Sequence, residues 1–188
     1  MDMSVTREQA EDAVRVLLEF IGEDPNRGGL LKTPSRVVNA FSEYFSGYSQ
    51  APSEILSAKF SDAQHYDDYI LLKNIKFISH CEHHMARIIG VAHVAYIPNK
   101  AIVGISKIAR LVDAFAKRLQ VQERMTLQIA ESIEKHLDAL GVAVVICAEH
   151  GCMTSRGVKK DGTIMRTQKL LGQFKNDERL MASFLASI

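Results

Sequence analysis

The stretch IIGVAHVAYIPN, residues 88–99, is the clearest strand signal in this chain of 188 residues. Small and β-branched residues fill positions 88–97, and Pro98 with Asn99 then ends the pattern, which predicts a strand over that range. Just upstream, residues 69–78 have the same strand-like character. Because the segment between the two strands is short, we expect a turn to join them.

Two helical patterns follow this pair of strands, over residues 106–119 and about 122–140. In the second pattern, apolar residues recur at helical spacing at Met125, Ile129, Ile133 and Leu137. Strand-like runs return over 142–148 and 163–174, and a last apolar helical stripe follows near the C-terminus. Paired strands that alternate with paired helices are typical of an α+β fold, so we expect a largely antiparallel sheet with the helices on one face.

Two further amphipathic helices are expected before the first strand. Thr6 begins a capping box in the first helix, and the Thr-Pro pair at 33–34 begins the second. Residues 50–64 have weak periodicity and are expected to connect these helices to the sheet. The predicted organisation is an N-terminal helical segment over residues 1–50 and one α+β domain over residues 51–188 that acts as a single functional unit.

The composition excludes several classes of protein. Charged residues make up 24% of the chain and the net charge is +1, so no broad basic surface for nucleic acid is expected. The N-terminus lacks the apolar core of a signal peptide, and no stretch approaches the roughly 20 apolar residues needed to span a bilayer. We therefore expect a cytoplasmic protein with no membrane or nucleic-acid partner. The three cysteines cannot all pair with one another, and in a reducing compartment metal binding or catalysis explains them better.

Two clusters of reactive side chains follow predicted strands, HCEHH at residues 80–84 and EHGC at residues 149–152. Cys81, His84 and the distant Cys152 are suitable zinc ligands, because zinc prefers sulfur and nitrogen in tetrahedral geometry. Three protein ligands leave a fourth position open for water, which is the mark of a catalytic zinc site. The alternative is that these are unrelated thiols and surface histidines.

Other cysteine and histidine residues have simpler explanations. Cys147 lies inside an apolar strand and is expected to be a core thiol that faces away from Cys152. His93 lies within a strand and His136 within a helix, where packing or solvent exposure accounts for each of them.

The segment GISKIAR, residues 104–110, is a candidate phosphate site. Ser106 is placed to cap a helix, while Lys107 and Arg110 lie three residues apart on one helical face near the positive end of the helix dipole. Arg156 and Arg36 would add charge-assisted contacts if folding or assembly brings them near. The alternative is an ordinary solvent-exposed helix start.

The sequence Gln122-Glu123-Arg124 begins the next helix and alone is typical of a solvated helical turn. A carboxylate at this position is also able to accept paired hydrogen bonds from the N–H edge of a guanine ring. Guanine binding by this carboxylate is favoured only in combination with the candidate phosphate site.

Taken together, these segments resemble the GTP cyclohydrolase I family. The resemblance rests on CEHH at 81–84, HVAYIPN at 93–99, GISKIAR at 104–110, RLQVQER at 118–124, and HGCM with RGV between 150 and 158. It runs from TPSRV near residue 33 to the end of the chain. It implies a tunnelling fold (T-fold), in which subunit sheets join into a barrel and two five-membered rings stack as a homodecamer with active sites between subunits.

The resemblance also implies a reaction and a set of roles. GTP and water would give formate and 7,8-dihydroneopterin triphosphate, the first step of pterin and tetrahydrofolate synthesis. The implied zinc ligands are Cys81, His84 and Cys152. The implied proton-transfer residues are His83, His150 and Ser106. The implied substrate contacts are Glu123 and Gln122 at the guanine, and Ser106, Lys107, Arg110, Arg156 and a neighbouring subunit's Arg36 at the triphosphate and ribose.

Two other functions remain open at this point. A non-catalytic protein of the same fold would bind zinc for structure or regulation without turning over GTP. A zinc deaminase would release ammonia, but it would carry a downstream C-x-x-C pair that this chain lacks. The sequence also departs from the family pattern at Arg87 and Cys147, neither of which is a proposed ligand.

Overall fold

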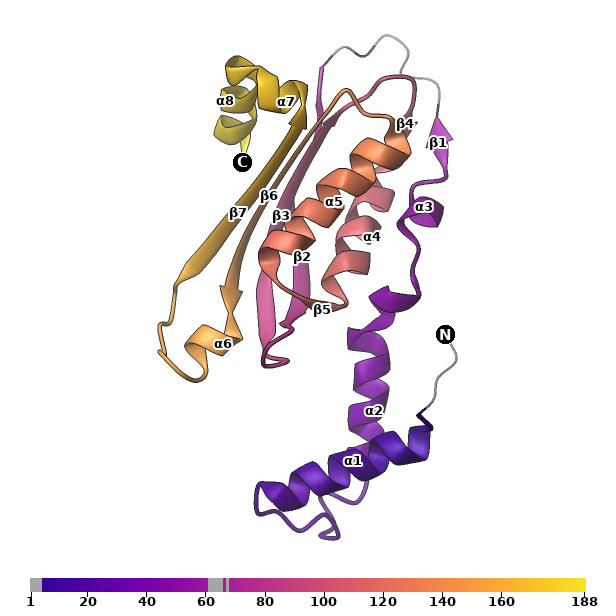
Figure 1. The fold of residues 1–188 in the computed structure, drawn as a ribbon, viewed down its shortest axis with the longest axis vertical. Coiled ribbons are helices and arrows are strands. Elements are labelled where there is room, and N and C mark those ends of the chain that lie inside the picture. The colour runs from indigo at the N-terminus through magenta and orange to yellow at the C-terminus, as the bar shows by residue number, and fades with distance from the viewer. Residues whose placement is uncertain (1–4, 61–65, 67) are drawn as a thin grey trace. The chain divides into compact units, whose positions relative to one another are not determined.

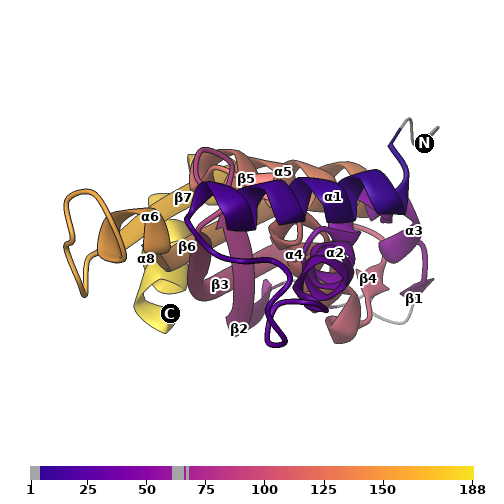
Figure 2. The ribbon, with the colours of Figure 1, turned by 90° about the horizontal axis from the view of Figure 1, so that it is seen from below.

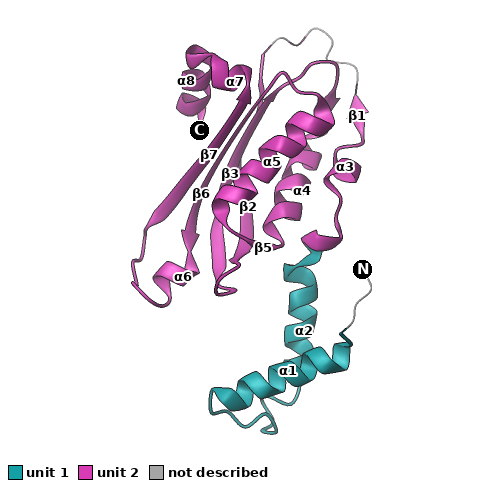
Figure 3. Cartoon of the chain, in the orientation of Figure 1, with its two compact units in different colours: residues 1–46 teal, residues 47–188 magenta. Residues whose placement is uncertain are grey.

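The computed structural model describes residues 5–60, 66 and 68–188, and its course is drawn in Figure 1. The chain divides into two compact units, residues 1–46 and residues 47–188 (Figure 3). This division lies close to the boundary expected after residue 50. That residues 51–188 act as a single functional unit stays a prediction.

The first unit contains two helices, α1 (Arg7–Phe20) and α2 (Thr33–Tyr44). The capping box expected at the first helix is confirmed, because the Thr6 hydroxyl accepts from the Gln9 amide at 3.2 Å and the Gln9 side chain accepts from the Thr6 amide at 2.8 Å. A side-chain hydrogen bond of 2.8 Å from Arg7 to Asn39 joins the two helices.

The second unit is built on a five-stranded sheet with the strand order β5-β2-β3-β6-β7. Its strands are β2 (Ile70–Cys81), β3 (Arg87–Ile97), β5 (Leu119–Gln120), β6 (Gly141–His150) and β7 (Ile164–Gly172). All neighbouring pairs are antiparallel except β2 and β5, which are parallel. The four long strands were expected from the sequence, whereas the two-residue β5 was not.

Helices α4 (Ile105–Ala116) and α5 (Gln122–Leu137) pack side by side on one face of this sheet (Figures 1 and 2). Their apolar residues form the main core with alternate residues of the central strands, among them Ile108, Leu111, Ile129, Ile133, Val144 and Ile146. Burying each such side chain contributes about 1.5–3 kcal/mol. The expected α+β architecture, a T-fold sheet with two central helices, is therefore confirmed.

The opposite face of the sheet is also partly covered, which corrects the expectation that all helices lie on one face. Helices α7 (Gln173–Asn176) and α8 (Glu178–Ser187) place Phe174 and Phe184 against Ala143 and Val145 of β6 in a second, smaller core. Strand β6 is an almost continuous apolar run, so its side chains on both faces have to be removed from water.

Shorter elements occupy segments that the sequence analysis left without structure. They are η1 (Ser46–Ser49), α3 (Pro52–Ile55), β1 (Lys59–Phe60), β4 (Ile102–Val103) and α6 (Gly151–Thr154). The expected connection over residues 50–64 contains α3 and β1, and its residues 61–65 lie outside the described residues. No helix in the described part of the chain combines the length and the apolar character needed to cross a membrane.

A β-bulge in β2 decides which side chains face the main core. The pairing of β2 with β3 shifts between Leu72 and Ile75, and Asn74 in this bulge has a left-handed φ of 59°. Before the bulge Leu72 packs against the main core, and after it Phe77 and Cys81 do. The extra residue changes the alternation from even to odd positions, so it directs Cys81 to the helix-covered face.

Candidate active site

Strands β2 and β6 deliver the two reactive clusters to the same end of the sheet. Strand β2 ends at Cys81, and β6 ends at His150, directly before the short helix α6 that carries Cys152. Strand β3 lies between them, with Arg87 opposite His80 on one side and Ile88 opposite His150 on the other. The register of β3 therefore sets the spacing between the two clusters.

The turn between β2 and β3 presents the first cluster. The Cys81 amide donates to the Ala86 carbonyl at 2.8 Å, and the Met85 amide donates to the Cys81 carbonyl at 2.8 Å. Met85 has a φ of 53°, a left-handed conformation that closes this tight turn. Cys81 is only 5% exposed while His84 is exposed, so a ligand held between them remains reachable from solvent.

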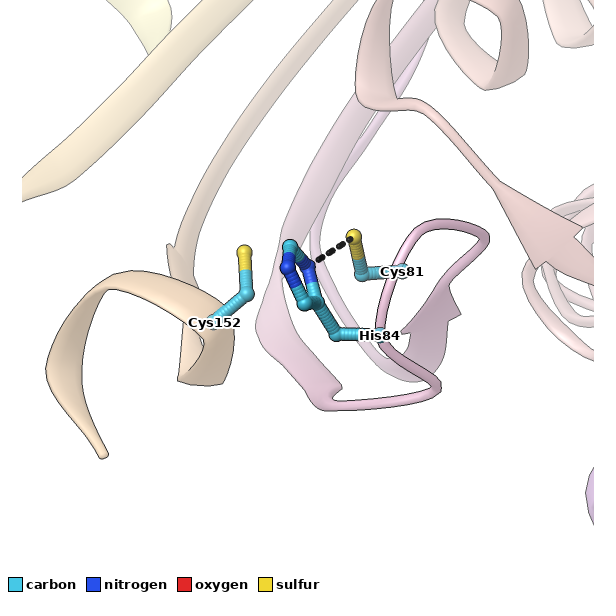
Figure 4. Close-up of side chains that lie close together, drawn as sticks. All are labelled: Cys81, His84 and Cys152. Atoms are coloured by element: carbon cyan, nitrogen blue, oxygen red, sulfur yellow. Dashed lines mark hydrogen bonds between the residues drawn. The ribbon is translucent and has the colours of Figure 1, made fainter. Parts of the chain in front are cut away.

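Cys81, His84 and Cys152 form a compact group of metal-ligating side chains. Their ligand atoms all lie within 4.8 Å of one another, and the His84 ring lies between the two thiols (Figure 4). The Cys81 sulfur is 4.0 Å from His84 Nδ1. Two sulfurs and one imidazole nitrogen at this separation suit zinc, and the protein supplies three ligands as a catalytic site does.

The electrostatics of the two thiols also fit a bound cation. Burial raises the pKa of the Cys152 thiol, and the hydrogen bond and charge of Cys81 raise it further. The Cys152 thiol therefore resists becoming a thiolate unless a positive charge is placed near it. A divalent metal supplies that charge and deprotonates a coordinating thiol.

Two residues without a predicted role in this site hold the ligand-bearing turn against the start of α5. The guanidinium of Arg124 pairs with the Glu82 carboxylate and donates to the Leu119 carbonyl at 3.0 Å. The Glu82 amide donates to the Gln120 carbonyl at 3.1 Å. No local signal predicts this pair, because Glu82 and Arg124 are 42 residues apart and each looks like an ordinary surface charge.

The expected acid/base residues occupy two different environments near the cluster. His83 is exposed, with Nδ1 3.8 Å from the Cys81 sulfur. His150 is half-buried, and its Nε2 lies 2.8 Å from the Gln122 side-chain oxygen. Burial lowers the pKa of His150, and the charge of Glu123 partly opposes this shift. Gln122 itself is only 1% exposed, whereas Glu123 next to it is exposed.

The expected phosphate residues fall into two groups. Arg156 lies beside the metal ligands, with Nη1 3.4 Å from His84 Nε2. Ser106, Lys107 and Arg110 lie in the first half of α4, while the far end of that helix leads into β5 beside Cys81. A helix of 12 residues is about 18 Å long, so one chain does not bring the start of α4 to the metal ligands.

Two expectations about single residues need comment. Ser106 was expected to cap α4, but the helix begins at Ile105 with Gly104 as its N-cap and no side-chain cap bond, so that expectation is wrong. Ser106 instead lies exposed in the first turn. Arg36 lies on α2 in the first unit. Cys147 is partly buried and packs against the second, smaller core.

Comparison with known proteins agrees with the resemblance noted in the sequence. A sequence model of the GTP cyclohydrolase I family matches residues 10–188. The chain is 57% identical to GTP cyclohydrolase 1 of Rickettsia felis over 180 residues, covering 96% of this chain and 95% of that protein. It is 52% identical to GTP cyclohydrolase 1 of Pelagibacter ubique over 184 residues, covering 98% and 91%.

Among solved structures, the chain is similar to an apo archaeosine synthase QueF-like protein, with a TM-score of 0.47 and 18% identity over 56% of this chain and 94% of that one. This similarity is too low to carry an argument. The family match and the relatives, by contrast, cover nearly the whole chain at high identity. The chain therefore belongs to the GTP cyclohydrolase I family.

Proposed function

We propose that this protein is a zinc-dependent GTP cyclohydrolase I that converts GTP and water into formate and 7,8-dihydroneopterin triphosphate, the first step of pterin and tetrahydrofolate synthesis. The observation that carries this proposal is the convergence of Cys81, His84 and Cys152 within 4.8 Å. His150 and the start of α5 lie at the same end of the sheet. Zinc bound by these three side chains would act as a Lewis acid and activate a water molecule.

The protein's own residues bind the purine and exchange protons with it. The exposed Glu123 carboxylate accepts hydrogen bonds from the N–H edge of the guanine. The protonated ring of His150 transfers a proton to N7 as the five-membered ring of the purine opens and is left neutral. His83 and Ser106 transfer protons during the later rearrangement of the ribose. Binding the remote triphosphate positions the base and contributes several kcal/mol, on the order of the entropy of an intramolecular reaction.

The triphosphate site requires more than one subunit. Lys107 and Arg110 lie about 14 Å and about 9 Å along α4 from the helix end that leads to the metal ligands of their own chain, while Arg156 lies beside those ligands. A second copy would bring its α4 to this metal cluster. This separation supports an oligomer with active sites between subunits, and we propose the homodecamer that the family resemblance implies. Arg36 of a neighbouring copy would add a further cation.

The site also suits a reducing compartment. All three cysteines are free, and two of them have to remain thiols to bind metal. We therefore propose that the enzyme works in the cytoplasm.

The decisive experiment is anaerobic incubation of the zinc-loaded protein with GTP, following formate and the absorbance of the pterin product. Cys152→Ser should lose more than about 100-fold in turnover, because even the outer partners of metal ligands contribute about 10–100-fold. Cys147→Ser is the matched control, because it removes a thiol that packs outside the cluster and should leave turnover intact.

Two results would contradict the proposal. Zinc binding without formate or pterin would indicate a non-catalytic protein of this fold. Release of ammonia in place of formate would indicate a deaminase.

A further inference from the structure

The side chain of Gln122 has a determined orientation. It is 1% exposed at the start of α5, and its amide nitrogen lies 3.1 Å from the Ile146 carbonyl oxygen and 3.1 Å from the Met165 carbonyl oxygen. Backbone carbonyl oxygens only accept hydrogen bonds, so the NH₂ group and not the oxygen of the amide has to face them. The side-chain oxygen of Gln122 therefore points the other way.

The hydroxyls of Thr126 and Thr167 hydrogen-bond to Gln122 and to each other, and the donor and acceptor of each of these bonds can be assigned. The Thr126 hydroxyl donates to the Gln122 backbone carbonyl at 2.7 Å, which uses its one hydrogen. It therefore accepts from the Thr167 hydroxyl, 2.7 Å away. Thr167 has then used its hydrogen as well, so its oxygen accepts from the Gln122 amide at 3.0 Å. The direction of each hydroxyl hydrogen bond is therefore fixed, while the two amide hydrogens of Gln122 are shared among three acceptors.

The network ends on a ring nitrogen of His150. The Gln122 side-chain oxygen lies 2.8 Å from His150 Nε2, and an amide oxygen only accepts. His150 Nε2 must therefore carry the hydrogen. In the neutral ring this leaves the lone pair on Nδ1.

We propose that Gln122 is a positioning residue, which holds His150 as the Nε2–H tautomer and makes Nδ1 the atom that exchanges a proton with the substrate. The role of Nδ1 rests on the proposed function, whereas the tautomer does not. The expected role of Gln122 was contact with the guanine. Its amide has two hydrogens for three acceptors, which leaves no N–H to offer a base.

Helix geometry explains why Gln122 and Glu123, which are adjacent on α5, have different roles. Successive helical residues point about 100° apart, so Gln122 is buried against β6 and β7 while Glu123 is exposed. Gln122 therefore orients His150, and the exposed Glu123 remains available to bind the purine. Fixing the ring is useful, because proton transfer depends on a short and aligned path.

The tautomer can be read directly by nitrogen NMR of the full-length, zinc-loaded protein with ¹⁵N-labelled histidine and no GTP. At about pH 8, above the usual histidine pKa of about 6.5, His150 should show a protonated Nε2 and an unprotonated Nδ1. Subtracting the spectrum of His150→Asn assigns the signals. A protonated Nδ1 in the wild-type spectrum would by itself overturn the proposal.

Substitutions then test whether the side-chain oxygen of Gln122, and not the rest of the hydrogen-bond network, fixes the tautomer of His150. Gln122→Met keeps the length but removes the acceptor, so His150 should become a mixture of both tautomers. Thr167→Val is the matched control, because the two backbone carbonyls still orient the amide and the Nε2–H signature should persist. An unchanged signature in Gln122→Met would contradict the assignment.

Kinetics distinguish a positioning residue from a substrate contact. Gln122→Met should lower kcat by about 10²-fold or more at nearly unchanged KM, within the range of general acid–base catalysis. In a His150→Ala background, Gln122→Met should cost almost nothing further. A raised KM with unchanged kcat would show that Gln122 contacts GTP and would overturn the proposal.

Failure of the two proposals would look different. If the wild-type protein does not turn over GTP, the proposed function fails, while the nitrogen spectrum still decides the tautomer. If turnover is normal but Nδ1 carries the hydrogen, only the role of Gln122 fails.

Discussion

Single residues decide how the metal cluster is presented. Asn74 accepts the left-handed conformation that the bulge in β2 requires, and this extra residue turns Cys81 toward the main core. His84 reaches the same point from an exposed turn. A buried sulfur and an exposed imidazole therefore hold one metal between the core and solvent, which suits a site that has to admit a substrate.

His93 should make the folded state sensitive to acid. It is 7% exposed, and its Nδ1 has no hydrogen-bond partner within the described ranges 5–60, 66 and 68–188. Burial lowers the pKa of His93, and the charges of Lys73 and Arg166 lower it further. Below the unfolded-state value of about 6.5, the unfolded chain binds the proton more readily, so this contribution to stability is present above that pH and is lost as pH falls.

We therefore expect His93→Gln to reduce the loss of thermal stability between about pH 7.5 and 5.5. Circular dichroism melts at one protein concentration measure this difference. Equal losses in both proteins would show that other groups control the acid response.

At the scale of elements, the close pairing of β3 with β6 positions the metal ligands at the end of the sheet. Gly90 lies opposite Ala148, and a Cβ built on Gly90 would stand 2.3 Å from the Cys147 carbonyl oxygen and 2.5 Å from the Ala148 Cβ. These are backbone and short side-chain atoms that cannot move aside alone. Any residue larger than glycine would have to separate the two strands whose ends set the spacing of the metal ligands.

Gly90→Ala should destabilise the protein by about 1–3 kcal/mol, the usual cost of overpacking a well-packed interior. It should also weaken zinc binding, because β6 leads directly to Cys152. Urea unfolding and chelator competition measure the two effects. Gly28→Ala is the control, since its added Cβ meets nothing within 4 Å. Equal stability of the two variants would count against this account of the strand pairing.

At the scale of the whole molecule, the proposed triphosphate residues of α4 are separated from the metal ligands along the helix. Lys107 is in the first turn of α4 and Arg110 is at its middle, and the metal ligands are near the strand that follows its end. We therefore expect two copies to assemble one triphosphate site beside one metal.

Mixing two inactive variants tests this arrangement. Cys152→Ser removes a proposed metal ligand and Arg110→Ala removes a proposed triphosphate contact, so each alone should have little activity. Subunits exchanged between them in equal amounts should recover up to about one quarter of wild-type turnover, because some sites draw both intact halves from different chains. A sedimentation mass of about 210 kDa, ten times the 21.0 kDa chain, would agree with the decamer. Activity of a monomer, or no recovery on mixing, would exclude shared sites.

Much of the site was predictable because it depends on residue chemistry and local pattern. The motif around Cys81 and the one around Cys152 indicated a metal site, and the order of strands and helices followed from periodicity. The pairing of Arg124 with Glu82 was not predictable, nor was the hydrogen bond between Gln122 and His150. Each joins residues far apart in the chain whose meeting depends on register and packing.

The sequence by itself therefore determined the kinds of ligand, the alternation of paired strands and helices, and the family to which the chain belongs, because these are written in residue types and short spacings. The tertiary structure decided the bulge that directs Cys81, the use of both faces of β6, the orientation of the Gln122 amide, and the distance between the start of α4 and the metal ligands. Those features arise only when strands take one register and helices take one side, since periodicity specifies faces and lengths but not which distant residues meet.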